Sequence, residues 1–154
     1  MSPIVTRPTL LDHAVMNLHD YVWARLPFVV PMAIAASRAR GDDGSRELAH
    51  LVRGLQPLLL DHLGREEAML VERSAAAVRL RLRDGIHADH HAVSTVIDQI
   101  RAVTGRAYRA REGAGPAERA LYVELARLDE HVRAQIAIEE HLLTWDQRVI
   151  GAGA

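Results

Sequence analysis

Apolar residues recur at alternating spacings of three and four along most of the chain, the pattern of a helix with one buried face. No segment alternates apolar and polar residues with a period of two, so the pattern predicts no strand. Glycine and proline clusters divide the sequence into four long periodic segments joined by short connections. We therefore expect an all-α protein, an up-down-up-down antiparallel four-helix bundle. The expected helices are 9–40, 45–73, 86 to between 105 and 112, and 116–150.

Hydroxyl residues mark the starts of the first two expected helices. Thr9 and Ser45 are suited to accept a hydrogen bond from a backbone amide of the first turn, so each is expected to be an N-cap. Pro27 and Pro31 lie inside the first helix and remove two backbone donors. We therefore expect a kink or a short break near Leu26.

The later boundaries are marked by glycine. Asp84-Gly85 is expected to precede the third helix, and residues 74–83 either stay helical or form a loose connection. The sequence Gly113-Ala114-Gly115-Pro116 is the strongest loop signal, with the proline near the first turn of the fourth helix. The expected organisation has three parts: an irregular lead-in over 1–8, one helical domain over 9–150, and a flexible tail over 151–154.

The composition excludes several classes of site and partner. The 154 residues suit a single domain, and a net charge of −1 gives no electrostatic footprint for nucleic acid. The absence of cysteine excludes disulfides, zinc ribbons, iron–sulfur clusters and thiol nucleophiles. There is no signal-peptide pattern and no apolar run approaching about 18 residues. We expect a cytoplasmic protein that binds neither nucleic acid nor membrane, and the oligomeric state is left open.

Polar, ligand-capable residues interrupt the apolar stripe on every expected helix. On the second helix, for example, the stripe passes through Leu55 and Leu59 and then continues through two polar residues four apart. On the first helix His13 is an alternative to the residue on the stripe, because the prolines could distort that helix. The polar residues on or beside the stripe are His19, His62, Glu66, His90, Gln135 and Glu139, with His131 on the flank of the fourth helix.

Burying several carboxyl groups in one core requires partners, and metal coordination supplies them. Mixed imidazole and carboxylate ligands suit iron, zinc or manganese. A ferritin-type site is disfavoured, because Glu47-x-x-His50 is the only Glu-x-x-His pair and it lies at the wrong level. The His-Glu-x-x-His motif of helical zinc proteases is absent. The remaining histidines, including His87, are interpreted as surface residues.

The order and spacing of these residues resemble the hemerythrin-like, or HHE cation-binding, family. Its pattern is a histidine on the first helix, His-x-x-x-Glu on the second, histidine on the third and His-x-x-x-Glu on the fourth. The resemblance spans about residues 9–146 and includes a Glu-Glu-x-x-Leu continuation after both pairs. The matching positions are His19, His62 with Glu66, His90, and Gln135 with Glu139.

The resemblance implies a non-haem di-iron centre in which two glutamates bridge the irons and histidines fill the ends. Members of the family reversibly bind dioxygen, sense oxygen or iron, react with peroxide or nitric oxide, or hold iron. The sequence is therefore compatible with three functions. They are a protein that binds or senses a small ligand, an enzyme that consumes peroxide or nitric oxide at the same centre, and a bundle without metal that acts as an interaction module.

The sequence departs from the family at Gln135, where the pattern has histidine. A glutamine amide oxygen is a weaker, neutral ligand, so we expect one iron to be under-coordinated on this side. His131, one turn earlier, is the alternative ligand if the fourth helix shifts or bulges. A site with one metal or none is the remaining alternative.

Overall fold

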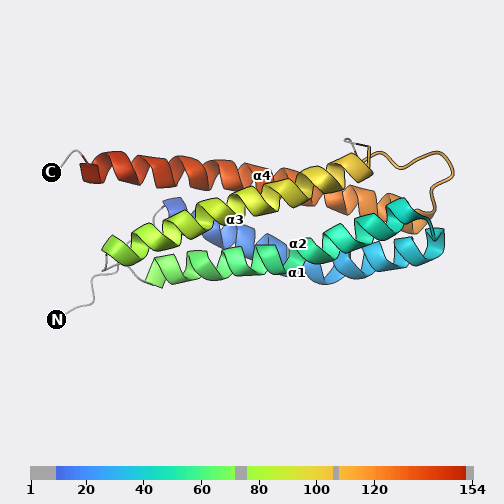
Figure 1. Cartoon of the computed structure of the whole chain (residues 1–154), viewed down its shortest axis with the longest axis horizontal. Coiled ribbons are helices and arrows are strands. Elements are labelled where there is room, and N and C mark those ends of the chain that lie inside the picture. The colour runs from blue at the N-terminus through green and yellow to red at the C-terminus, as the bar shows by residue number, and fades with distance from the viewer. Residues whose placement is uncertain (1–9, 72–75, 106–107, 152–154) are drawn as a thin grey trace.

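A computed structural model describes residues 10–71, 76–105 and 108–151, and within them the side chains of 20–68, 81–105 and 108–141. The described chain forms four helices, α1 (Leu10–Arg40), α2 (Asp43–Val71), α3 (Ala76–Val103) and α4 (Pro116–Gly151). They run alternately up and down along one axis, as Figure 1 shows. The all-α, up-down-up-down expectation is confirmed.

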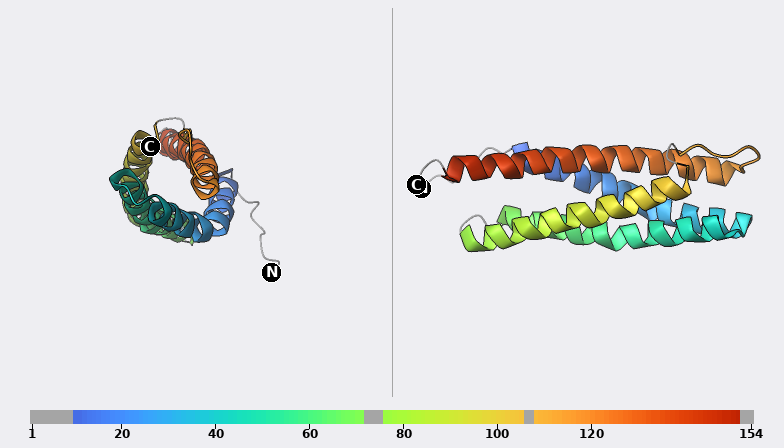
Figure 2. Two further views of the ribbon diagram at one scale, coloured as in Figure 1. Left: turned by 90° about the vertical axis from the view of Figure 1, so that its right-hand side faces the viewer. Right: turned by 45° about the horizontal axis from the view of Figure 1, so that its top comes forward.

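The four helices, seen end-on in the left view of Figure 2, surround one apolar core. Helix α2 packs between α1 and α3, and α4 packs mainly against α1 and much less against α3. No helix in the described ranges is both long and apolar enough to cross a membrane. The residues buried most completely include Val22, Leu55, Leu59, Ile97, Leu121 and Leu125.

Helix α2 begins two residues earlier than expected, and its N-cap is an aspartate. The Asp42 Oδ1 atom accepts a hydrogen bond from the Ser45 amide at 2.8 Å, and the Ser45 hydroxyl donates to the Asp42 carbonyl at 2.9 Å. The prediction that Ser45 is the N-cap was therefore wrong. The Asp42 carboxylate caps the helix three residues earlier by accepting from the Ser45 amide, so Ser45 lies inside the first turn. The expected cap of α1, Thr9, lies outside the described residues.

Helix α1 continues through Pro27 and Pro31 without the break expected near Leu26. Both prolines lie on the exposed side of the helix, four residues apart, while Leu26 and Val29 are buried on the other side. A carbonyl deprived of its helical donor on an exposed side can hydrogen-bond to water. The core contacts of Leu26 and Val29 hold the buried side in helical register.

Helix α3 begins at Ala76, so the boundary predicted at Asp84-Gly85 was wrong. Glycine inside a helix costs only about 1 kcal/mol relative to alanine. Here it also makes room for α2, because a Cβ atom at Gly85 would lie 3.2 Å from Arg65 Cδ. Helix α3 ends at Val103, before the predicted range, and Gly105 follows with a positive φ of 77°, as is common after a helix.

The connection from α3 to α4 is tied to the bundle by a tyrosine. Tyr108 has a φ of 50°, uncommon for a residue with a side chain, and its hydroxyl donates to Asp129 Oδ2 at 2.9 Å. The Asp129 carboxylate is buried and also accepts a 2.5 Å hydrogen bond from Arg133. This network fixes the level at which α4 starts relative to α3.

Candidate metal centre

The second helix contributes a histidine and a glutamate to the core of the bundle. His62 and Glu66 lie four residues apart on the buried stripe of α2, and each is 1% exposed. Their spacing places both side chains on one face of the helix, so His62 Nε2 lies 3.6 Å from Glu66 Oε1.

Helices α3 and α4 add one residue each to the same point. Glu139 of α4 is 1% exposed, and its Oε2 atom lies 3.5 Å from His62 Nε2 and 3.1 Å from His90 Nε2. The rings of His62 and His90 meet edge to face, with centroids 4.9 Å apart. Ligand atoms of His62, His90 and Glu139 all lie within 4.8 Å of one another, as a shared cation requires. The contributing halves of α2, α3 and α4 lie at the same end of the bundle in Figure 1.

The two buried carboxyl groups differ in protonation. Burial and the neighbouring Glu139 carboxylate raise the pKa of Glu66 to about 9, so this group carries a proton at neutral pH. Burial alone would also raise the pKa of Glu139, but the neighbouring His62 and His90 rings and the Gln135 amide outweigh it and lower that pKa to about 2. Without a cation, the pair therefore holds one negative charge. A divalent cation would remove the cost of ionising both carboxyl groups.

Hydrogen bonds among the described residues do not satisfy every polar group of the cluster, and the His62 ring shows this most clearly. Both of its nitrogens are buried, and neither makes a hydrogen bond to any described residue. Its Nδ1 atom lies 4.0 Å from Asp89 Oδ2, and Asp89 is paired with Arg65. A fully buried imidazole without a hydrogen bond is costly, whereas a neutral imidazole nitrogen is a common metal ligand. The donor set therefore fits a cation.

Gln135 belongs to the same cluster but faces it with its amide nitrogen. It is 5% exposed, and Nε2 donates to Glu139 Oε1 at 2.9 Å. His131, the alternative ligand, lies one turn earlier and stacks on Tyr21 with ring centroids 4.0 Å apart. Its Nε2 atom is buried without a hydrogen bond to a described residue. Helix α4 is continuous through this region, so no bulge brings His131 into the cluster.

The contribution of the first helix lies outside the described side chains. His19 and His13 both fall within α1, but only its backbone is described at these positions. The choice between them stays a prediction from the sequence. The N-terminal half of α1 lies in the half of the bundle that holds the cluster (Figure 1).

The structure adds two polar residues that the stripe did not single out. His87, interpreted from the sequence as a surface residue, is half-buried, and its Nδ1 lies 2.8 Å from Glu140 Oε1. The same oxygen lies 2.5 Å from His90 Nδ1. Glu140 is one residue off the core stripe, so only the packing of α3 against α4 reveals these contacts. The sequence signal was the Glu139-Glu140 doublet together with histidines three apart on α3.

Glu140 also orients the His90 ring toward the cluster. Burial alone would lower the pKa of His90, but hydrogen bonds to Glu139 and Glu140 outweigh it and raise that pKa. When Nδ1–H donates to Glu140, the lone pair on Nε2 faces Glu139. Metal-ligating histidines commonly donate their second nitrogen to a carboxylate in this way.

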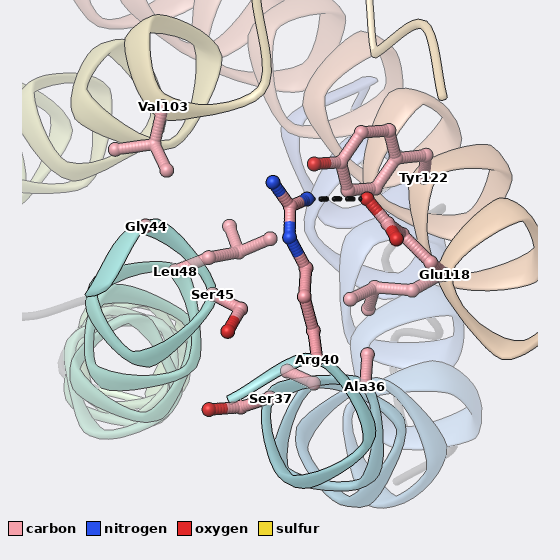
Figure 3. Close-up of a pocket in the computed structure, with 11 residues that line it drawn as sticks. Ala36, Ser37, Arg40, Gly44, Ser45, Leu48, Val103, Glu118 and Tyr122 are labelled. Atoms are coloured by element: carbon pink, nitrogen blue, oxygen red, sulfur yellow. Dashed lines mark hydrogen bonds and ion pairs between the residues drawn. The ribbon is translucent and has the colours of Figure 1, made fainter. Parts of the chain in front are cut away.

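A small cavity of about 40 Å³ lies near the other end of the bundle, among the ends of all four helices (Figure 3). Arg40 reaches across it and donates to Glu118 at 2.6 Å, beside Tyr122. Arg40 is paired with Asp42 as well, so its charge is already matched by carboxylates. This volume suits one or two water molecules and not a cofactor.

Comparison with known proteins gives no match: no protein-family model matches the chain, and neither does any curated protein or solved structure. The molecule is a four-helix, all-α domain with a buried cluster of two histidines and a glutamate that could hold a metal ion.

Proposed function

We propose that the protein is a non-haem iron protein of the hemerythrin-like type, which uses the buried cluster to hold an iron pair. The pair would bind or sense a small ligand such as dioxygen, peroxide or nitric oxide. The observation that carries the proposal is the His62 ring, which is buried, makes no hydrogen bond to a described residue, and lies 3.5 to 3.6 Å from two buried carboxyl groups.

Each residue of the cluster has a role in this proposal. His62 and His90 would hold iron through imidazole nitrogens, and Glu66 and Glu139 would supply carboxylate oxygens, because each carboxylate has two oxygens to offer. Gln135 would turn its amide oxygen toward the metal or keep its hydrogen bond to Glu139. On α1, His19 is the ligand that the sequence predicts. When bound, iron supplies a position for a diatomic or peroxide ligand and the capacity to change oxidation state.

The surroundings of the cluster favour a small ligand. Buried apolar side chains lie one turn from the cluster on three helices: Leu59, Val93 and Val132. Such a shell excludes water and limits what can approach, which also sets the redox behaviour of a metal. A chain that only stores or senses iron would use the same ligands, so the first question is whether iron binds.

Metal analysis of protein purified from iron-supplemented cells tests the proposal. We expect between one and two equivalents of iron in the wild type, with oxo-bridged absorption after exposure to air. A Glu139→Gln variant should lose most of the iron, whereas the exposed control Glu67→Gln should keep it. Less than about half an equivalent in the wild type, without that absorption, would reject the proposal.

A bundle without metal that acts as an interaction module is the second proposal. It is favoured by two large side chains on the outer side of α1, Trp23 at 61% and Phe28 at 65% exposed. On this proposal Glu139 is satisfied by Gln135 and His90 alone. If adding iron to the metal-free protein leaves its melting temperature unchanged, that result would support the second proposal over the first.

A further inference from the structure

A second group of potential ligands lies against the buried cluster, closer to solvent. His87 and His90, three residues apart on one face of α3, both direct Nδ1 at Glu140 Oε1 of α4, at 2.8 and 2.5 Å. One ligand atom from each of the three lies within 4.8 Å of the others. The side chains of His87 and Glu140 are 37% and 38% exposed, whereas that of His90 is 5% exposed.

We propose that His87, His90 and Glu140 form an outer metal site that captures a divalent cation and passes it to the buried cluster. Two imidazoles and a carboxylate are a suitable set for Fe²⁺, Zn²⁺ or Co²⁺. Three protein ligands leave a position for water, so a hydrated cation can bind without losing its whole shell. The capture site stands on its own geometry, and the transfer step rests on the proposed function.

His90 is the residue that joins the two sites. Its Nδ1 faces Glu140, and its Nε2 faces Glu139 at 3.1 Å. A neutral imidazole has one lone pair, so it binds a cation through one nitrogen while the other keeps its proton. With the cation in the outer site, Nε2–H donates to Glu139. With the cation in the buried cluster, Nδ1–H donates to Glu140.

Transfer between the sites therefore needs no rotation of the ring. The cation leaves Nδ1 and binds Nε2; the Nε2 proton is released to solvent, and Nδ1 takes up a proton from solvent beside the half-exposed Glu140, so the net protonation of the ring is unchanged. Glu139 and Glu140 lie within hydrogen-bond distance of these two nitrogens, and each accepts the N–H hydrogen bond in the state in which its nitrogen carries the proton. The two sites are consequently alternatives for one neutral His90.

The kinetics of metal uptake test the proposal on the full-length, metal-free chain. Co²⁺ is the probe, because its visible absorption reports binding by imidazole and carboxylate. In stopped-flow mixing, His87→Ala should load about tenfold more slowly than the wild type and reach the same final absorbance. His91→Ala is the matched control, since His91 is an exposed histidine of α3 in neither group, and it should load at the wild-type rate. Equal rates in all three proteins would overturn the proposal.

An equilibrium titration separates the two sites. His62→Leu removes a ligand of the buried cluster but leaves the outer site, so this variant should still bind one Co²⁺. The double variant His62→Leu with His87→Ala should bind none. A folded His62→Leu protein that binds no Co²⁺ would overturn the outer site. If the wild type and His62→Leu both bind a single Co²⁺ that His87→Ala abolishes, the outer site stands and the buried iron centre fails.

Discussion

Replacing Glu66 with glutamine should stabilise the metal-free protein and weaken its response to metal. The Glu66 side chain is 1% exposed beside Glu139, and the pKa of its carboxyl group is raised to about 9 by burial and by that neighbour. The folded protein therefore takes up a proton that the unfolded chain does not hold at pH 7. Glutamine has nearly the same shape and needs no proton.

The magnitude follows from the ordinary pKa of 4.5 for the group. A folded-state pKa above the ordinary value means that stability is full below pH 4.5 and is lost as the pH rises toward 9. Each pH unit in this window costs about 1.4 kcal/mol, so Glu66 lowers the free energy of unfolding at pH 7 by about 3 kcal/mol. Glu66→Gln should recover most of that at pH 7 and about 1 kcal/mol or less at pH 5.

Urea unfolding in the presence of a chelator, at pH 5 and pH 7, measures this difference. Glu67→Gln serves as the control, because Glu67 is the same residue type, one position along the helix, and its side chain is exposed. After metal is added the order should reverse, since the wild type gains binding energy that the variant lacks. A Glu66→Gln protein that is less stable than the wild type at pH 7 without metal would show that Glu66 is not held protonated at a cost in the folded protein.

Three further substitutions test how the bundle is held together. Tyr108→Phe should lower the free energy of unfolding by about 1–2 kcal/mol in denaturant titrations, because it removes a hydrogen bond to the buried Asp129 carboxylate; an unchanged value would contradict that role. Leu59→Ala should cost about 2–5 kcal/mol by calorimetry, since Leu59 is 0% exposed, and a loss below about 1 kcal/mol would mean that the core collapses around the site. Asp42→Ala should lower the melting temperature at neutral pH. The hydrogen bond from the Ser45 amide helps to hold the pKa of Asp42 at about 2, so Asp42 stabilises the protein fully above pH 3.8. The higher melting temperature of the wild type should therefore vanish as the pH falls through 2. A difference in melting temperature that persists there would contradict this cause.

The sequence predicted which residues of the cluster are buried, because helical periodicity decides which residues face a core. His62, Glu66, His90, Gln135 and Glu139 are each at most 5% exposed, as their positions on the apolar stripe predicted. That they bind metal is still a prediction. To predict their burial, only the spacing within each helix and an antiparallel arrangement of the helices were required.

The features that the sequence did not predict depend on contacts between helices. From the sequence alone, Gly85 indicates a helix boundary. In the structure it lies inside α3, where Arg65 of α2 packs against it. Glu140 lies beside the core stripe and meets His87 only because α3 and α4 align at that level. The N-cap at Asp42 was missed because two acidic residues and a serine compete for one short turn, and the carboxylate is the stronger acceptor.

Anomalous scattering at the iron edge, from crystals of iron-loaded protein, tests the central claim most directly. We predict anomalous peaks within bonding distance of His62, His90 and the Glu66 and Glu139 carboxylates. We also predict that Nδ1 of His90 keeps its hydrogen bond to Glu140 in that state. An iron-loaded crystal without a peak among these four residues would contradict the proposed iron centre.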